Sequence, residues 1–187
     1  MNLEKVMARF NQLSTAAARL DGILPILARM VFFAVLAVYF WKSALTKLGG
    51  GVWGFLTPSS GAYVQIFPKA MEQVGYDTSQ LGLWHWFVVL AGTWAEFILP
   101  LMIIIGFLTR LSALGMIGFI IVQSLTDLFG HGLTSSSDVV GTWFDRTSEA
   151  VIMDQRLLWI FLLFVLVVKG AGKLSVDHIF LQGRYTR

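Results

Sequence analysis

The sequence predicts an all-α integral membrane protein, a four-transmembrane-helix bundle with an N-terminal amphipathic interfacial helix. Composition is the first reason, because 56% of the 187 residues are hydrophobic and 13% are charged, whereas about a quarter of a soluble domain is charged. The second reason is the grouping of apolar residues into four stretches, at about 25–48, 83–108, 111–129 and 156–170. Since about 20 apolar residues cross a bilayer as a helix, each stretch is a candidate transmembrane helix.

Residues 1–22 precede these stretches and follow a different pattern. Apolar side chains such as Val6, Met7 and Phe10 recur at helical spacing, and charged residues such as Lys5 and Arg9 take other positions. A helix with this pattern lies on a membrane surface. The segment has no long apolar run, so we expect no cleavable signal peptide.

The four-helix domain is expected to occupy residues 23–178, with a basic tail at 179–187. The apolar part of its last helix, residues 157–168, spans only about 18 Å. This helix therefore needs the long side chains of Arg156 and Lys169, or a thinner bilayer, in order to cross.

Composition also excludes several kinds of chemistry. The chain has no cysteine, so it forms no disulfide, holds no iron–sulfur cluster through thiolates and has no cysteine nucleophile. The net charge of +3 is small and reflects membrane orientation. We therefore expect membrane lipids, and not nucleic acid, among the partners.

Two long loops, 52–82 and 130–155, lie on the same side of the predicted bundle. Loops of this length are functional or partly structured, and residues 63–74 are predicted to form a short helix. The loops are expected either to dock another protein subunit or to form a passive surface. With both termini cytoplasmic, the inner side receives nine lysines and arginines and the outer side five, which favours that orientation.

Glu96 is the single carboxylate of the second apolar stretch and falls near its middle. An ionised carboxylate in hydrocarbon needs a basic partner, a wet cavity or a proton. We expect Arg29, one turn inside the first helix, to pair with Glu96 because the two lie at similar depths. Arg110 or Asp177 would extend this pair. The carboxylate then either locks helices together or takes part in function.

A second polar group is predicted at the outer ends of the helices. Asp127 and His131 are four residues apart and would share one face of a continued helix. His85, Lys42 and Lys47 are expected nearby. Such a group suits metal binding, proton transfer beside a quinone head, or a polar cluster without a ligand. We expect no metal and no haem.

Several short motifs resemble the DoxX family. They are Arg29 at the start of the first helix, Ser43–Leu48 at its end, Trp94–Glu96, Gly106–Arg110 and the closing segment Gly170–Asp177. The resemblance implies a four-helix protein of bacterial inner membranes or archaea. Some relatives are subunits of a thiosulfate:quinone oxidoreductase, and others associate with redox-defence or sulfur-transfer proteins. Because many have no assigned activity, the family indicates fold better than function.

The resemblance and the polar residues together predict a quinone-interacting subunit of a redox complex in the bacterial inner membrane, linked to sulfur or oxidative metabolism. The expected catalytic residues are Glu96, His85 and Asp127. The expected quinone-binding residues are Arg29, Lys47, Trp94 and Arg110, with Trp84 and Trp86 as further pocket walls. Two alternatives stay open: a non-catalytic membrane anchor or assembly subunit that docks a partner, and a small-solute carrier. A homo-oligomer also stays open.

Overall fold

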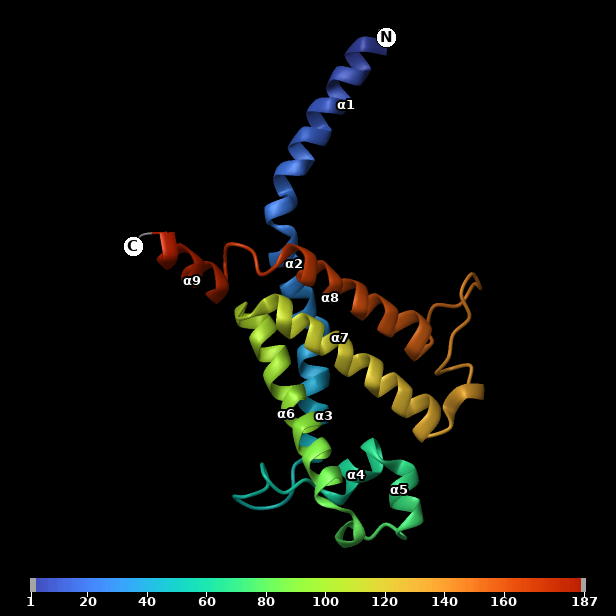
Figure 1. The fold of residues 1–187 in the computed structure, drawn as a ribbon. Helices are drawn as coiled ribbons and strands as arrows, with labels where there is room; N and C mark the ends of the chain where they lie inside the picture. The colour runs from blue at the N-terminus through green and yellow to red at the C-terminus, as the bar shows by residue number, and fades with distance from the viewer. Residues whose placement is uncertain (1–2, 186–187) are drawn as a thin grey trace.

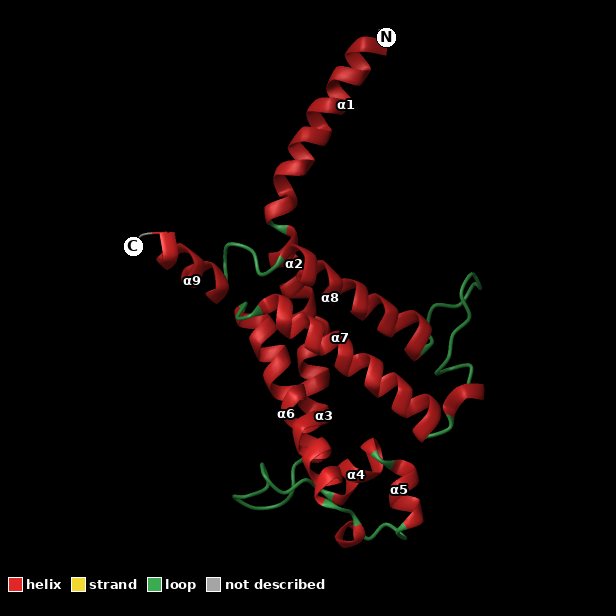
Figure 2. Cartoon of the chain, viewed as in Figure 1, coloured by secondary structure: helices red, strands yellow, loops and turns green. Residues whose placement is uncertain are grey.

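The computed structural model describes residues 3–185, and most of this chain is helical (Figures 1 and 2). Within the described residues, four helices are long and apolar enough to cross a membrane: Leu20–Lys47, Leu83–Ile105, Thr109–Gly130 and Val151–Lys169. The predicted fold class, an all-α membrane protein with four spans, is confirmed.

Three of these spans combine α-helix with a wider π-helical segment. The first consists of α2 (Leu24–Phe32), a π-helical segment Phe33–Ala37 and α3 (Val38–Lys47). The second is α6 (Leu83–Ile105). The third is α7 (Thr109–Leu125) followed by the π-helical segment Thr126–Gly130, and the fourth is α8 (Leu157–Lys169) preceded by the π-helical segment Val151–Arg156. The fourth span thus begins five residues earlier than predicted and is longer.

The spans form a closed ring in which the first contacts both the second and the fourth, and the third lies between those two. An even number of crossings brings both ends of the described chain to one side of the bundle (Figure 1). We call this side, where α6 and α8 end and α7 begins, the termini end. The opposite side, which carries α4 and the two long loops, is the loop end.

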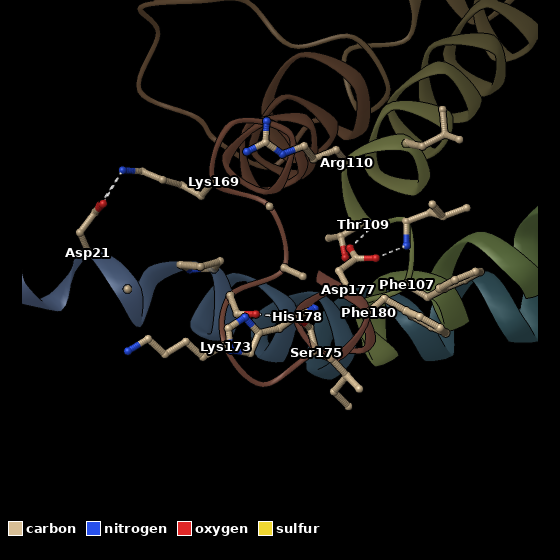
Figure 3. A pocket seen from close by; sticks show the side chains of 18 residues that line it. Asp21, Phe107, Thr109, Arg110, Lys169, Lys173, Ser175, Asp177, His178 and Phe180 are labelled. Atoms are coloured by element: carbon tan, nitrogen blue, oxygen red, sulfur yellow. Dashed lines mark hydrogen bonds and ion pairs between the residues drawn. The ribbon is translucent and has the colours of Figure 1, made fainter. Parts of the chain in front are cut away.

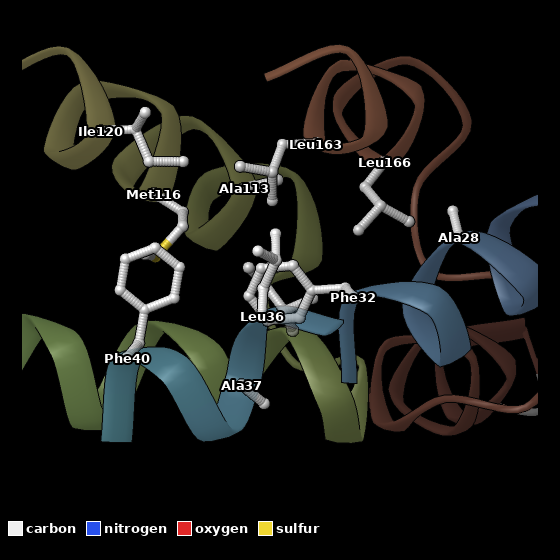
Figure 4. Close-up of a cluster of buried hydrophobic side chains, with 11 residues drawn as sticks. Ala28, Phe32, Leu36, Ala37, Phe40, Ala113, Met116, Ile120, Leu163 and Leu166 are labelled. Atoms are coloured by element: carbon white, nitrogen blue, oxygen red, sulfur yellow. The ribbon is translucent and has the colours of Figure 1, made fainter. Parts of the chain in front are cut away.

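The centre of the ring is filled by apolar side chains from all four spans, most of them from the first, third and fourth (Figure 4). The largest fully buried members are Phe32, Leu36, Phe40, Ile103, Met116, Ile120, Leu163 and Leu166. This packing leaves little room for a ligand along the bundle axis. Polar side chains therefore gather at the two ends of the bundle and at the few buried positions where a polar residue takes the place of an apolar one.

Two short helices at the loop end cover the start of α6. The predicted helix at 63–74 is broken in two, α4 (Ser60–Ile66) and α5 (Pro68–Gln73), because Pro68 opens the second helix. A small apolar cluster of Ala62, Tyr63, Met71 and Val89 joins these helices to α6. Burial there raises the pKa of the Tyr63 hydroxyl. The first long loop is thus a docked cap on α6.

The two ends of the described chain leave the bundle as separate helices. Helix α1 (Leu3–Ala18) projects beyond the termini end, and Val6, Met7 and Phe10 are exposed on it. Its location on a membrane surface stays a prediction. The predicted basic tail is largely helical, as α9 (Val176–Tyr185). The remaining residues of the predicted terminal segments, 1–2 and 186–187, lie outside the described residues.

Candidate functional site

A buried ion pair joins Lys47, the last residue of α3, to Glu96 in the middle of α6. Lys47 Nζ lies 2.9 Å from Glu96 Oε1 and 2.8 Å from Oε2, and the two side chains are 6% and 2% exposed. The Ser43 hydroxyl accepts a hydrogen bond from the ammonium at 2.7 Å and donates one to Glu96 Oε1 at 3.2 Å. The carboxylate therefore has the partners that a charge in a membrane domain requires.

Arg29 does not pair with Glu96, so that prediction is wrong. Its guanidinium instead donates to four backbone carbonyls, those of Ile103, Ile104, Ala171 and Leu174. The last carbonyls of a helix have no donor within that helix, and those at the end of α6 lie closer to Arg29 than the deeper carboxylate does. Lys47 reaches Glu96 because the last turn of α3, from Ser43 to Lys47, lies beside the middle of α6.

Asp177 also has a role other than the predicted one. Its carboxylate accepts hydrogen bonds from the backbone N–H groups of Leu108 at 2.7 Å and Thr109 at 2.9 Å, and so caps the start of α7. Its own N–H donates to the Gly106 carbonyl at 2.8 Å. Arg29 and Asp177 together hold the closing segment against the turn between α6 and α7. Their role is therefore structural.

Asp127, a predicted catalytic residue, is held by Arg156. Arg156 Nη2 lies 2.7 Å from Asp127 Oδ2, and Nη1 donates to the Ser124 hydroxyl at 3.0 Å. Both ends of this ion pair lie in π-helical segments, which often occur at functional sites. The sequence indicated Arg156 only as a snorkelling residue at a helix end, so its buried position, 4% exposed, was missed.

The two outer histidines contact the same segment of the first long loop, at Gln65 and Phe67. His131 Nε2 is 3.2 Å from the Gln65 carbonyl oxygen of α4. The His85 ring packs edge-on against Phe67, with ring centroids 4.8 Å apart, and its Nδ1 is buried without a hydrogen-bond partner. In the described part of the chain, no three His, Asp or Glu residues lie close enough to hold a metal ion. The predicted outer group therefore offers no metal-binding arrangement among these residues, and Asp127 is paired with Arg156.

His85 and Glu96 share the inward face of α6. They are eleven residues apart in the sequence, which is about three helical turns or 16 Å along the axis. Val89 and Thr93 lie between them and are 0% and 1% exposed. We call this face the inward stripe of α6. It carries His85 near the loop end, whose Nδ1 has no hydrogen-bond partner in the described chain, and the buried Glu96 at mid-depth.

Tryptophan side chains fix the first long loop to α6. The indole N–H of Trp86 donates to the Leu56 carbonyl at 3.2 Å, and that of Trp94 donates to the Phe55 carbonyl at 3.1 Å. Both rings stay partly exposed, at 38% and 37%. Trp84, the third predicted pocket wall, is more exposed and stacks on Phe87.

The predicted site residues are therefore divided between the two ends of the bundle. Lys47 and Glu96 are in contact, and Trp94 precedes Glu96 by two residues on α6. His85 and Asp127 lie at the loop end, on different helices. Arg29 and Arg110 lie at the termini end, where Arg110 is the second residue of α7 and lines a separate cleft. These residues cannot form a single pocket.

Comparison with models of protein families finds a match to the DoxX family over residues 26–132. Comparisons with curated proteins and with solved structures found no match. The matched region holds Arg29, the Lys47–Glu96 ion pair and the turn between α6 and α7, and it covers more than half of the chain. The chain belongs to the DoxX family.

Proposed function

We propose that the chain is a quinone-interacting subunit of a membrane redox complex, with the quinone head group at the loop end. Membership of the DoxX family supports a membrane protein, and quinone-linked oxidoreductases are frequent associates of that family. The observation that carries the proposal is the inward stripe of α6, where the unpartnered Nδ1 of His85 lies on the same face as the buried Glu96. Perturbed or unpaired titratable groups in such positions are candidates for proton handling.

The residues at the loop end fit a quinone in two respects. A quinone is a flat ring with two carbonyl acceptors, so its site needs apolar or aromatic walls and at least one donor. The Phe67 ring, whose centroid lies 4.8 Å from that of His85, offers an aromatic wall, and the Nδ1–H tautomer of His85 offers a donor. Trp86 and Trp94, in contrast, are hydrogen-bonded to the first long loop on other faces of α6. Lys47 and Glu96 are already hydrogen-bonded to each other and to Ser43. We therefore do not assign them a direct contact with the head group.

Each of these residues then has a defined task. A bound quinone supplies two-electron, two-proton redox chemistry at its ring. His85 would bind a ring carbonyl and exchange a proton at Nδ1. Glu96 is a second group on the same helix face that can exchange a proton, and Lys47 balances its charge. We assign the electron source to a partner protein or a small reductant such as a sulfur donor, because the described residues offer no group of three ligands for a redox metal.

The test measures quinone bound to protein purified in mild detergent, together with reduction of a quinone analogue by thiosulfate or a co-purified partner. His85→Gln is compared with the matched control His131→Gln, which removes the other loop-end histidine. We expect about fivefold less retained quinone in His85→Gln, because one hydrogen bond of about 1 kcal/mol is lost. Wild-type protein without quinone, or equal retention in both variants, would contradict the proposal.

A non-catalytic docking subunit is the second candidate, and exposed aromatic side chains in both long loops favour it. Trp53, Trp143 and Phe144 are 67%, 56% and 104% exposed. Exposed aromatic groups of this size are typical of contact sites. The double variant Trp143→Ser, Phe144→Ser should then lose a co-purifying partner chain while its quinone content stays that of the wild type. An unchanged partner yield would contradict docking through this loop.

We also propose the bacterial inner membrane as the location, with both termini cytoplasmic. The excess of lysine and arginine on the termini side supports this orientation. The exposed aromatic groups of the loop end then face the periplasmic side, where a partner or an outer-leaflet surface would meet them.

A further inference from the structure

The termini end holds a cleft that the proposed function does not use. It has a volume of 1190 Å³ and lies among the turn between α6 and α7, the closing segment and the start of α9 (Figure 3). Helix α7 begins at Thr109 and α8 ends at Lys169, both of which line it, and Pro25 at the start of α2 lines it too. Because spans begin and end around it, the cleft lies at a boundary between membrane and water.

The cleft has more positive charge than its carboxylates neutralise. Arg110, Lys169 and Lys173 line it together with Asp21 and Asp177. Asp21 pairs with Lys169 at 2.6 Å, and Asp177 is bound by two backbone N–H groups at the start of α7. Arg110 and Lys173 have no acidic partner among residues 3–185 as described. Two cations therefore have no ion-pair partner within that range, and the charged side chains that line the cleft leave an excess of one positive charge.

The Arg110 side chain lies beside the backbone of Gly170 and is accessible. A Cβ atom at Gly170 would be 3.4 Å from Arg110 Nε, and the φ of Gly170 is +78°. Figure 3 shows the guanidinium over the end of α8, between Lys169 and Asp177 in that view. A side chain at position 170 would be in ordinary contact with the guanidinium. Arg110 itself is exposed, so the cation is open to a ligand.

Exposed apolar side chains border these cations. Leu111, Ile179 and Phe180 are 64%, 69% and 67% exposed and line the same cleft. The ring of Phe180 lies 6.5 Å from that of Phe107, which holds α9 beside the turn between α6 and α7. Cations next to an apolar border at a membrane surface match the two parts of a phospholipid, its phosphate and its acyl chains.

We propose that this cleft binds the head group of an anionic phospholipid, with Arg110 on the phosphate, Lys173 as a second positive charge on the other side of the closing segment (Figure 3), and the acyl chains against Leu111 and Phe180. A guanidinium binds a phosphate through two parallel hydrogen bonds, and the more distant ammonium contributes only a long-range attraction. The recognised chemistry is a phosphate ester anion. Its lipid source follows from the apolar border and from the position of the cleft where spans end.

The test titrates the full chain in mild detergent with phosphatidylglycerol or phosphatidylcholine and measures lipid binding by native mass spectrometry. Wild-type protein should bind phosphatidylglycerol at least about tenfold more tightly, because its net negative charge meets a cleft with an excess of positive charge. The double variant Arg110→Gln, Lys173→Gln should weaken phosphatidylglycerol binding by about 30-fold and phosphatidylcholine binding by less, because phosphatidylcholine carries the same phosphate but no net charge.

The matched control is Lys42→Gln, Lys69→Gln, which removes the same charge from two exposed lysines outside the cleft. This control should keep wild-type affinity. Equal affinity for the two lipids, an equal loss in the control, or displacement of phosphatidylglycerol by the same concentration of inorganic phosphate would each overturn the proposal. If the double variant does not fold, Arg110→Lys replaces it: this change keeps the charge but removes the paired hydrogen bonds, and unchanged affinity would overturn the proposed phosphate contact.

Discussion

At the residue scale, Glu96 shows how this membrane domain accommodates a charge. The carboxylate is 2% exposed and takes all its hydrogen bonds from Lys47 and Ser43, one turn apart on α3. The alternative basic residue, Arg29, is occupied by backbone carbonyls at the other end of the first span. Among the described residues, Lys47 and Glu96 therefore form an ion pair only with each other.

We predict that Glu96→Gln lowers the free energy of unfolding by about 3–5 kcal/mol, because it leaves the Lys47 ammonium buried without its counter-charge. The double variant Lys47→Met, Glu96→Leu should recover most of this loss, since an apolar pair replaces both charges. Tryptophan fluorescence during unfolding in detergent measures both. Lys42→Met, an exposed change on the same helix, should stay within about 0.5 kcal/mol. A loss below about 1 kcal/mol for Glu96→Gln would refute the structural role of the pair.

At the element scale, π-helical segments and one glycine set the geometry of the spans. Buried residues of the first span recur every fourth position, at Ala28, Phe32, Leu36, Phe40 and Ala44. A spacing of four drifts around an α-helix by about 40° at each step, and the wider turn of the segment Phe33–Ala37 offsets part of that drift. The apolar pattern predicted a helix here but carries no signal for the wider turn.

We predict that Gly106→Ala destabilises the fold by about 2 kcal/mol or more. Gly106 ends α6 at a φ of +71°, and a Cβ atom there would lie 2.5 Å from Ser175 Cβ and 2.9 Å from Arg29 Cζ. The left-handed conformation alone costs a side chain about 1–2 kcal/mol, and the closing segment would also have to shift. Thermal unfolding in detergent measures the effect. Gly50→Ala, where a Cβ atom meets nothing within 4 Å, is the control. Equal melting temperatures for the two variants would show that the close contact of Gly106 with Ser175 and Arg29 does not contribute to stability.

At the scale of the whole molecule, the two ends of the bundle differ in chemistry. The termini end presents free cations beside apolar groups, and the loop end presents exposed aromatic groups and buried titratable residues. The apolar core between them separates the two regions. A lipid site at one end and a quinone or partner site at the other can therefore coexist, and variants at one end should not affect binding at the other.

We predict the orientation of this asymmetric molecule from the distribution of lysine and arginine. The chain has no cysteine, so a single introduced cysteine gives an unambiguous label. In intact bacterial cells, a membrane-impermeant maleimide should label Ser137→Cys in the second long loop. Lys5→Cys in α1 should be labelled only after the cells are permeabilised. The reverse pattern would place the termini outside.

The sequence by itself determined the class, the number of spans and the position of the chain reversals. Crossing a bilayer requires a long apolar helix whose backbone groups are satisfied internally, and both properties are local. The depth of Glu96 and its need for a basic partner also follow from local sequence.

Only the tertiary structure decided which partners these groups have. The choice of Lys47 over Arg29 for Glu96 depends on which turn of the first span lies beside the middle of α6, and the Arg29 contacts depend on unpaired carbonyls at a helix end. The Asp127–Arg156 ion pair and the contacts of His85 and His131 with Phe67 and Gln65 depend on where α4 and the π-helical segments lie. Such contacts join residues far apart in the chain. They are set by the axial offset of packed helices, which hydrophobic periodicity does not encode.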